Sequence, residues 1–218
     1  GEYKIPDEQT LSRLKEHIDS NKVKTDDSTK TISLEDDQML IDLGSIAKGY
    51  TSDKISKIMK NDGIESAVVS LGGNVQAVGK KPDGSQWKVA IQNPFDENDY
   101  AAVVTVDDCA VITSGAYQRY FEQDGKTYHH IMDPSTCAPA DTDLASVTIV
   151  SKDATLADAY STTLFILGKE KAVDFWCKNK NDFDIILIGK DNSVVVSQNI
   201  ADSFTVLNEN FDNVEIAK

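Results

Sequence analysis

The sequence has few cysteines and no apolar run of about eighteen residues, the length that a membrane-spanning helix requires. Cys109, Cys137 and Cys177 form no C-x-x-C pair and have no histidine at metal-ligand spacing, which argues against a zinc site. Three cysteines allow at most one intramolecular disulfide, and we interpret them as small packing residues. The sequence therefore offers neither a membrane helix nor a cysteine-based metal centre.

Positive charge is also scarce, because 22 Lys and Arg residues face 36 Asp and Glu residues and leave a formal net charge of -14. Such a surface repels the phosphates of nucleic acids and of anionic lipids, so a nucleic acid partner is not expected. A divalent cation such as Mg²⁺ suits this charge better. The chain opens with GEYKIPDEQT, which has no leader-like pattern and starts with Gly; we expect a processed chain whose leader lies upstream.

No repeat, low-complexity stretch or Pro/Gly/Ser-rich linker divides the chain, so we expect one domain over residues 1–218. Strands precede helices and further strands without regular βαβ alternation, which predicts an α+β fold with a largely antiparallel, meander-like sheet. Helices are predicted over 6–20, 46–59, 154–167 and 169–178. Strands are predicted over 31–34, 38–43, 66–71, 74–78, 87–92, 101–106, 109–113, 144–151, 185–188 and 194–196.

The segment IDLGSIAKGYTSDKISKIM, residues 41–59, is the most informative stretch. A strand expected at 39–41 leads through Gly44 and Gly49 into a helix whose free N–H groups would favour an anion or a metal-bound phosphate beside Asp42 and Ser45. The pattern nearly matches the phosphate-binding loop G-x-x-x-x-G-K-[ST], but Tyr50 replaces the lysine, which argues against an ATPase or GTPase. The glycines could equally serve close packing of helix on strand. The apolar face of this helix is expected to hold Ile46, Tyr50, Ile55, Ile58 and Met59.

A second candidate site lies on the helix predicted over 154–167. Asp158, Ser161 and Thr162 are three and four residues apart, so their oxygens point the same way within one turn. Oxygen ligands of this kind suit Mg²⁺ or Ca²⁺ and would not suit zinc. Phe165 in the same stripe predicts that this face is covered. The alternative is a solvated helix face, or hydroxyls that bond back to the preceding turn.

The stretch YHHIMDPSTCAP places two of the three histidines before a turn at 133–134. Neighbouring strand residues face opposite sides, so at most one of His129 and His130 can face a given site. His130 is the candidate general base, and the alternative is an exposed, hydrogen-bonded histidine at a strand end. Ser114 lacks the G-x-S-x-G context of a hydrolase nucleophile.

The motifs DLGSIAKGY, SLGGN, TSGAYQRYF, HHIMDPSTCAP and DATLADAYSTTLFILG, in this order over residues 40–168, resemble the ApbE family of FAD:protein FMN transferases. The resemblance implies a flavin transferase that uses Mg²⁺ to cleave the pyrophosphate of FAD, releases AMP and attaches FMN through a phosphoester to a Ser or Thr of a target flavoprotein. It also implies an extracytoplasmic lipoprotein anchored to the membrane, with the lipidated cysteine upstream of this chain. Family members usually carry a further N-terminal region that supplies part of the flavin pocket.

The resemblance also implies roles for single residues. Asp42 and Lys48 match positions that contact FAD, and Met132 matches a position that contacts the flavin. His130 matches the histidine that deprotonates the acceptor hydroxyl.

For the metal, the resemblance implies ligation by the backbone oxygen of Ser45 and by the side chains of Asp158 and Thr162. Ser161 stands where some members have an acidic ligand. Cys137 stands where the family pattern D-P-x-T-G has glycine, which puts the turn after His130 in question.

Two alternatives to flavin transfer remain at this stage. An FAD pyrophosphatase would use the same metal and pyrophosphate cradle but would let water replace the acceptor hydroxyl. A non-catalytic flavin-binding or partner-docking module would not need His130 or Asp158, and both residues are present.

Overall fold

A seven-stranded sheet forms the centre of the computed structural model, which describes residues 4–218. Its strand order is β16-β14-β13-β12-β7-β4-β3, and every neighbouring pair is antiparallel except β14 and β16. The strands are β3 (Ser66–Leu71), β4 (Asn74–Gly79), β7 (Ala110–Gly115), β12 (Leu144–Ser151), β13 (Asp184–Gly189), β14 (Val194–Ser197) and β16 (Val214–Ala217). All eight residues of β12 are buried, because both faces of the sheet are covered.

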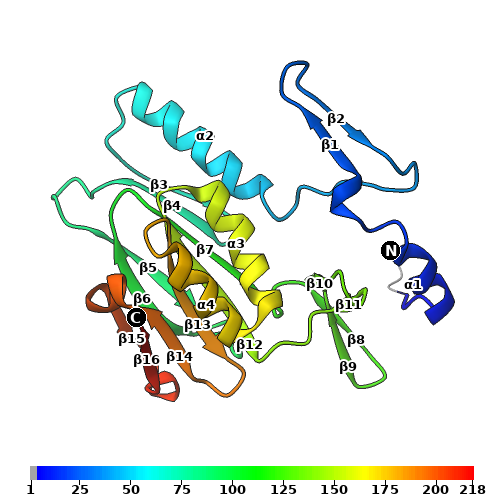
Figure 1. Cartoon of the computed structure of the whole chain (residues 1–218). Coiled ribbons are helices and arrows are strands. Elements are labelled where there is room, and N and C mark those ends of the chain that lie inside the picture. The colour runs from blue at the N-terminus through cyan, green and yellow to red at the C-terminus, as the bar shows by residue number, and fades with distance from the viewer. Residues whose placement is uncertain (1–3) are drawn as a thin grey trace.

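The two faces of the sheet carry separate hydrophobic cores. In β13, Ile185 and Leu187 point to one core while Ile186 and Ile188 point to the other, as the twofold alternation of a strand requires. Helices α3 (Ala154–Leu167) and α4 (Lys169–Asn179) cover the first face (Figure 1). A three-stranded sheet of β5 (Trp87–Gln92), β6 (Tyr100–Val106) and β15 (Phe204–Val206) contributes the second core. The α+β fold class is confirmed, whereas the single meander is wrong because β5 and β6 leave the main sheet.

Helix α2 (Ala47–Asn61) crosses α3 through small residues rather than through an apolar face. Its buried residues are Gly49, Ser52 and Ser56, whereas Tyr50 and Ile58 are more than half exposed. The predicted helix is confirmed. The predicted apolar face is wrong at Tyr50 and Ile58, whereas Ile46, Ile55 and Met59 are partly buried. A Cβ at Gly49 would lie 2.1 Å from the carbonyl oxygen of Ala154, so only glycine permits this approach.

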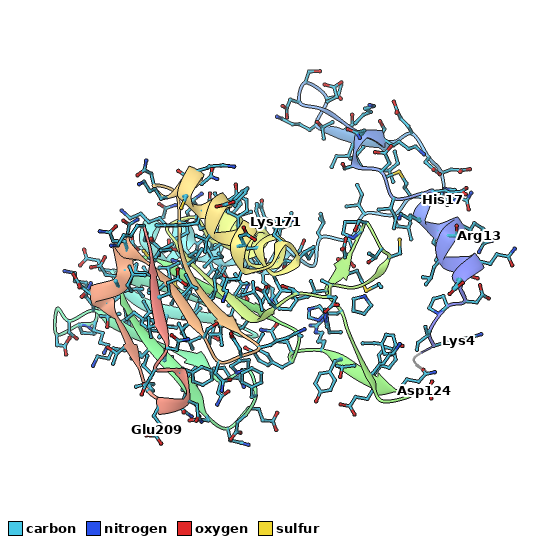
Figure 2. All side chains as sticks on the ribbon, turned by 60° about the horizontal axis from the view of Figure 1, so that its bottom comes forward. Lys4, Arg13, His17, Asp124, Lys171 and Glu209 are labelled. Atoms are coloured by element: carbon cyan, nitrogen blue, oxygen red, sulfur yellow. The ribbon has the colours of Figure 1, made fainter. Side chains whose placement is uncertain are left out.

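An N-terminal arm stands beside this body and consists of α1 (Glu8–Lys15), a 3₁₀ turn η1 (Ser20–Lys22) and a hairpin of β1 (Val23–Asp26) with β2 (Thr31–Leu34) (Figure 1). The carboxylate of Asp36 holds the arm together, because it lies 2.9 Å from Nδ1 of His17 and 3.1 Å from Nζ of Lys22. Bonding to His17 is the main cause that lowers the pKa of Asp36. Figure 2 shows His17 and Arg13 on this arm, away from the densely packed side chains of the body.

The strand predicted over 38–43 is wrong. Residues 39–43 have no regular structure, and Leu40 is 94% exposed because no neighbouring strand is available to pair with it. The partner of β2 is instead β1, which lies in the polar stretch before it.

Two short hairpins extend from the body toward the arm (Figure 1). The first is β8 (Tyr120–Gln123) with β9 (Lys126–His129), and the second is β10 (Met132–Asp133) with β11 (Ala138–Pro139). The remaining elements are the 3₁₀ turns η2 (Gln198–Ser203) and η3 (Glu209–Phe211). Within residues 4–218, no helix has the length and apolar character needed to cross a membrane.

Replacing Gly49 by alanine tests the α2 and α3 crossing. The new methyl group would also lie 2.6 Å from Cβ of Asp158, so the helices must separate. We expect Gly49→Ala to lower the free energy of unfolding by about 2 kcal/mol, a typical cost of overpacking, although alanine favours a helix. Urea denaturation measures the loss. Thr51→Ala, on the exposed side of the same helix, is the control, and an unchanged midpoint for Gly49→Ala would show that the crossing is not tight.

Candidate active site

A cleft of about 1490 Å³ lies where the N-terminal arm, the β10–β11 hairpin and the N-terminal turn of α2 meet. Every sequence-predicted site residue lines it except Ser161, which is fully buried. The predicted residues on its wall are Asp42, Ser45, Lys48, His130, Met132, Asp158 and Thr162. Segments more than one hundred residues apart in the sequence therefore meet at one place.

The carboxylate of Asp158 is the negative centre of the cleft. Its Oδ2 accepts the backbone N–H of Gly49 at 2.8 Å, and its Oδ1 accepts Nδ2 of Asn74 at 3.0 Å. The residue is only 4% exposed. Each carboxylate oxygen has a second lone pair, so both can still accept a ligand from the cleft.

Asp158 and Asp53 each bond to the N-terminal end of the helix that carries the other. Asp158 on α3 accepts an N–H from the first turn of α2, where an anion is favoured by the helix dipole. Asp53 on α2 accepts the backbone N–H groups of Ala154 and Thr155 at 3.0 and 2.9 Å, at the start of α3. Each helix thus fixes the end of the other, and with it the position of Asp158.

A cluster of hydroxyl groups lies beside Asp158. Oγ of Ser114 lies 2.8 Å from Oγ of Ser161 and 3.2 Å from Oγ1 of Thr162. Ser161 also donates to the carbonyl oxygen of Asp158, which leaves it behind the cleft wall rather than on it. Sequence reasoning considered Ser114 only as a hydrolase nucleophile and did not place it beside Ser161 and Thr162, because Ser114 lies on β7 and only the packing of α3 on this strand brings the three hydroxyls together.

The two histidines face different surroundings, as strand geometry predicted. His130 is exposed to the cleft, and its Nδ1 lies 3.2 Å from the carbonyl oxygen of Arg119. When Nδ1 donates its proton to that carbonyl, Nε2 is left free to accept one. His129 instead packs edge-on against Phe165, with ring centroids 5.8 Å apart, and burial lowers the pKa of His129.

Two cations on the cleft wall lack a carboxylate partner. Lys48 Nζ lies 3.2 Å from Oδ1 of Asn74, and neither Lys48 nor Arg119 forms an ion pair with another residue in the part of the chain that the structure describes. Arg119 was not among the sequence-predicted residues. Unneutralised cations in a chain of net charge -14 favour an anionic ligand here.

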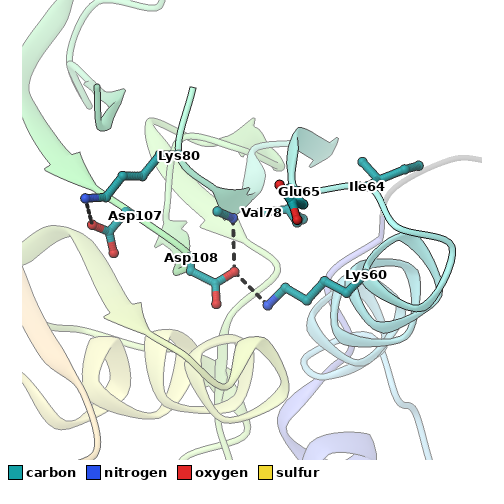
Figure 3. Close-up of a pocket in the computed structure, with 8 residues that line it drawn as sticks. Lys60, Ile64, Glu65, Val78, Lys80, Asp107 and Asp108 are labelled. Carbon is teal, nitrogen blue, oxygen red and sulfur yellow. Dashed lines mark hydrogen bonds and ion pairs between the residues drawn. The ribbon is translucent and has the colours of Figure 1, made fainter. Parts of the chain in front are cut away.

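A smaller hollow of about 300 Å³ shows the opposite arrangement (Figure 3). There Lys60 lies 2.6 Å from Asp108, and Lys80 lies 3.8 Å from Asp107. Its positive charges are already neutralised within the protein. The larger cleft is therefore the better candidate for a phosphate-bearing ligand.

The lining of the larger cleft also includes apolar side chains. The arm contributes Leu11, Leu14 and Ile18, and the segment at the start of the β10–β11 hairpin contributes Ile131 and Met132. Apolar lining of this kind suits a flat aromatic ring, while the polar lining suits phosphates. Tyr117 also lines the cleft, and burial raises the pKa of its hydroxyl group, which stays protonated at neutral pH.

The oxygen donors present fit a hard cation such as Mg²⁺. Asp158 and Thr162 provide a carboxylate and a hydroxyl on one wall, and Ser45 lies on the same cleft. Within residues 4–218 no group of three His, Cys, Asp or Glu side chains could hold a metal. A cation bound here would therefore draw its other ligands from backbone oxygens, water or a phosphate-bearing substrate.

Comparison with known proteins assigns the chain to one family. The model of the ApbE family matches residues 1–187 of the chain. The chain belongs to the ApbE family. The recognition of this family from the sequence motifs is confirmed.

ApbE relatives among curated proteins include the FAD:protein FMN transferases of Klebsiella pneumoniae and Treponema pallidum. The first is 35% identical over 196 residues, which cover 89% of this chain and 60% of the relative. The second is 42% identical over 193 residues, which cover 83% of this chain and 52% of the relative. The chain thus spans little more than half the length of these relatives.

Solved ApbE structures share the fold. The ApbE protein of Thermotoga maritima matches with a TM-score of 0.84 and 32% identity, over 92% of this chain and 64% of that one. The flavin transferase ApbE from Vibrio cholerae matches with a TM-score of 0.76 and 27% identity, over 95% and 62%. These likenesses agree with the α+β architecture described above.

The departure from the ApbE pattern at Cys137 has a structural consequence. Cys137 has a φ of 57°, in the left-handed region where glycine is the least strained residue. It is buried and lies on the cleft wall, in the turn between β10 and β11. The turn therefore keeps the backbone shape of a glycine turn although a side chain is present.

Two substitutions at Cys137 separate the side chain from the backbone. Cys137→Gly and Cys137→Ala both remove the thiol, but only glycine relieves the left-handed conformation. We expect the glycine variant to be more stable than the alanine variant by about 1 kcal/mol, the reverse of the usual order. Thermal unfolding of the two variants side by side measures this difference, and an alanine variant at least as stable as the glycine variant contradicts it.

Proposed function

We propose that this protein transfers FMN from FAD to a Ser or Thr hydroxyl of a target flavoprotein, through a phosphoester bond, with Mg²⁺ and with release of AMP. Relatives that carry the name FAD:protein FMN transferase support flavin transfer in general. The observation that carries the proposal is the cleft itself. It combines oxygen donors at Asp158 and Thr162, the cations Lys48 and Arg119, which form no ion pair among the described residues, and His130, whose Nδ1 is held by a carbonyl oxygen.

The cleft offers one place for each part of FAD. The apolar lining at Met132 and the arm would take the isoalloxazine ring, and the polar lining around Lys48 and Asp158 would take the pyrophosphate. Lys48 would approach the phosphates, and Arg119 supplies a second positive charge in the same cleft. The first turn of α2 adds the positive end of its helix dipole, although the N–H groups of Ala47, Gly49 and Tyr50 already have partners within the protein. Asp42, on the same wall, would contact FAD as the family resemblance implies.

His130 has the geometry of a general base. Its Nδ1 is held by the carbonyl oxygen of Arg119, so Nε2 can take the proton of the acceptor hydroxyl. The acceptor oxygen then bonds to the phosphorus of the FMN half, and the bond from that phosphorus to the bridging oxygen breaks. AMP leaves with the bridging oxygen, and the proton stays on His130 until solvent removes it.

Mg²⁺, held by Asp158, Thr162 and the backbone oxygen of Ser45, would neutralise charge on the pyrophosphate oxygens. Asp158 is suited to this because its two oxygens are already oriented by Gly49 and Asn74. Ser161 would support the site through Ser114 and not as a direct ligand, since it does not line the cleft.

Hydrolysis of FAD to FMN and AMP is the second candidate function. The exposure of His130 to the cleft favours it, because water could accept the phosphoryl group in place of a protein hydroxyl. An extracytoplasmic location on a lipid anchor remains a proposal from the family resemblance.

One assay distinguishes the two functions. The protein is incubated with FAD, Mg²⁺ and a flavoprotein that carries an acceptor Ser or Thr, and mass spectrometry follows the acceptor. We expect a mass increase that corresponds to one FMN, with one AMP released per adduct. Release of AMP without an adduct supports hydrolysis. If neither AMP nor an adduct is formed, both enzymatic functions are contradicted.

Variants of Asp158 and His130 test the roles proposed for these two residues. We expect Asp158→Ala to abolish metal-dependent turnover, because it removes the buried carboxylate that we assign to the cation. We expect His130→Ala to slow transfer about 100-fold or more while FAD binding persists, since general base catalysis contributes on that scale. Asp107→Ala, in the smaller hollow, is the control. Wild-type rates in both cleft variants would refute the site assignment.

A further inference from the structure

Asn74 lies between the ammonium group of Lys48 and the carboxylate of Asp158. It is 1% exposed, its Nδ2 donates to Asp158 at 3.0 Å, and its Oδ1 accepts from Nζ of Lys48 at 3.2 Å. The side chain therefore has a partner on both sides and no contact with the bulk solvent. The sequence pattern indicated the segment SLGGN as a possible binding turn through its paired glycines, but it assigned no role to Asn74 itself.

The orientation of this amide is fixed by its neighbours. Turning it over would bring its oxygen against the carboxylate of Asp158 and its NH₂ group against the ammonium of Lys48, and both contacts are repulsive. The backbone fixes its position as well. Gly72 and Gly73 have positive φ angles of 58° and 93°, and the turn they form places Asn74 opposite Leu71 at the start of β4.

Lys48 and Asp158 are close enough to pair if Asn74 is absent. The residue that follows Lys48 in the chain, Gly49, donates its N–H directly to the carboxylate of Asp158 at 2.8 Å. The flexible stem of Lys48 thus begins next to this carboxylate, and because Asp158 is only 4% exposed, the attraction between the two charges is stronger than it would be in bulk water.

We infer that Asn74 is a positioning residue that keeps Lys48 and Asp158 from neutralising each other. It bridges the two charges by hydrogen bonds without cancelling either, so that the ammonium remains available to a phosphate and the carboxylate to a divalent cation. This inference rests on the proposed function, because it assigns the two charges to the two parts of a metal and pyrophosphate ligand.

A double-mutant cycle tests the inference without any measurement of turnover. Asn74→Ala, Lys48→Met and the double variant are compared with the wild type. Mn²⁺ binding is measured by electron paramagnetic resonance, and FAD binding is measured by flavin fluorescence with EDTA present. Asn93→Ala is the matched control, because Asn93 is also buried and donates to a carboxylate, that of Asp99 at 3.0 Å, but it does not line the cleft.

For Mn²⁺, we expect Asn74→Ala to weaken binding about tenfold, because Lys48 then pairs with Asp158. Removing Lys48 as well should restore binding to near the wild-type value. For FAD without metal, Asn74→Ala and Lys48→Met should weaken binding to a similar extent, and the double variant should lose little more.

A purely structural role for Asn74 predicts a different result. The Mn²⁺ affinity of the double variant would then stay as low as that of Asn74→Ala, and this outcome overturns the inference. Wild-type Mn²⁺ affinity in Asn74→Ala overturns it as well. If the wild-type protein binds neither Mn²⁺ nor FAD, the proposed function is contradicted, and the inference that rests on it fails too. If the wild-type protein binds both ligands but the double variant does not regain Mn²⁺ affinity, only the inference fails.

A second variant covers the case in which Asn74→Ala does not fold. Asn74→Asp keeps the size of the side chain and places a carboxylate beside Lys48. We expect weaker FAD binding in EDTA, because the new carboxylate neutralises Lys48, and tighter Mn²⁺ binding, because it adds negative charge beside Asp158. A parallel loss of both affinities contradicts the inference.

Discussion

The close crossing of α2 and α3 at Gly49 is the contact on which the site depends. The absence of a side chain at Gly49 lets the first turn of α2 reach Asp158, and the N–H of Gly49 then bonds to that carboxylate. Asp53 makes the reciprocal contact at the start of α3. Because each carboxylate satisfies N–H groups that a helix end leaves unpaired, the crossing stabilises both helices and orients a buried charge at once. A larger residue at Gly49 would disturb the fold and the site together.

The rigid body behind this crossing explains why the site can be well defined in an open cleft. Helix α3 packs on β7 and β12, and the sheet beneath it has a hydrophobic core on each face. This support holds Asp158, Thr162 and Ser114 in fixed positions relative to one another. The opposite wall has a different character, because the N-terminal arm and the short hairpins have few buried residues. A firm polar wall and a lightly packed apolar wall together suit a ligand that carries phosphates at one end and an aromatic ring at the other.

Charge distribution, rather than total charge, selects the ligand of this cleft. The chain carries a net charge of -14, yet Lys48 and Arg119 line the cleft without a carboxylate partner among the residues described. In the smaller hollow, by contrast, lysines and aspartates pair with each other. A protein that is acidic overall can thus hold a polyanion where its few free cations converge, and a divalent cation can neutralise the rest of the ligand's charge.

The sequence by itself determined the family, the fold class and most of the elements of the body, because strands such as β12 and helices such as α3 carry local periodicity. It also indicated Asp158, Thr162 and His130, since the spacing of residues within one helix turn or one strand decides which of them share a side. It wrongly predicted a strand at 39–41, which pairs with no strand among the described residues, and it did not predict that α2 buries small residues while Tyr50 is exposed. Only the tertiary structure brought Ser114, Asn74 and Arg119 to the site. Their partners lie on other elements, and contacts across such distances depend on how helices and strands pack, which local sequence patterns do not encode.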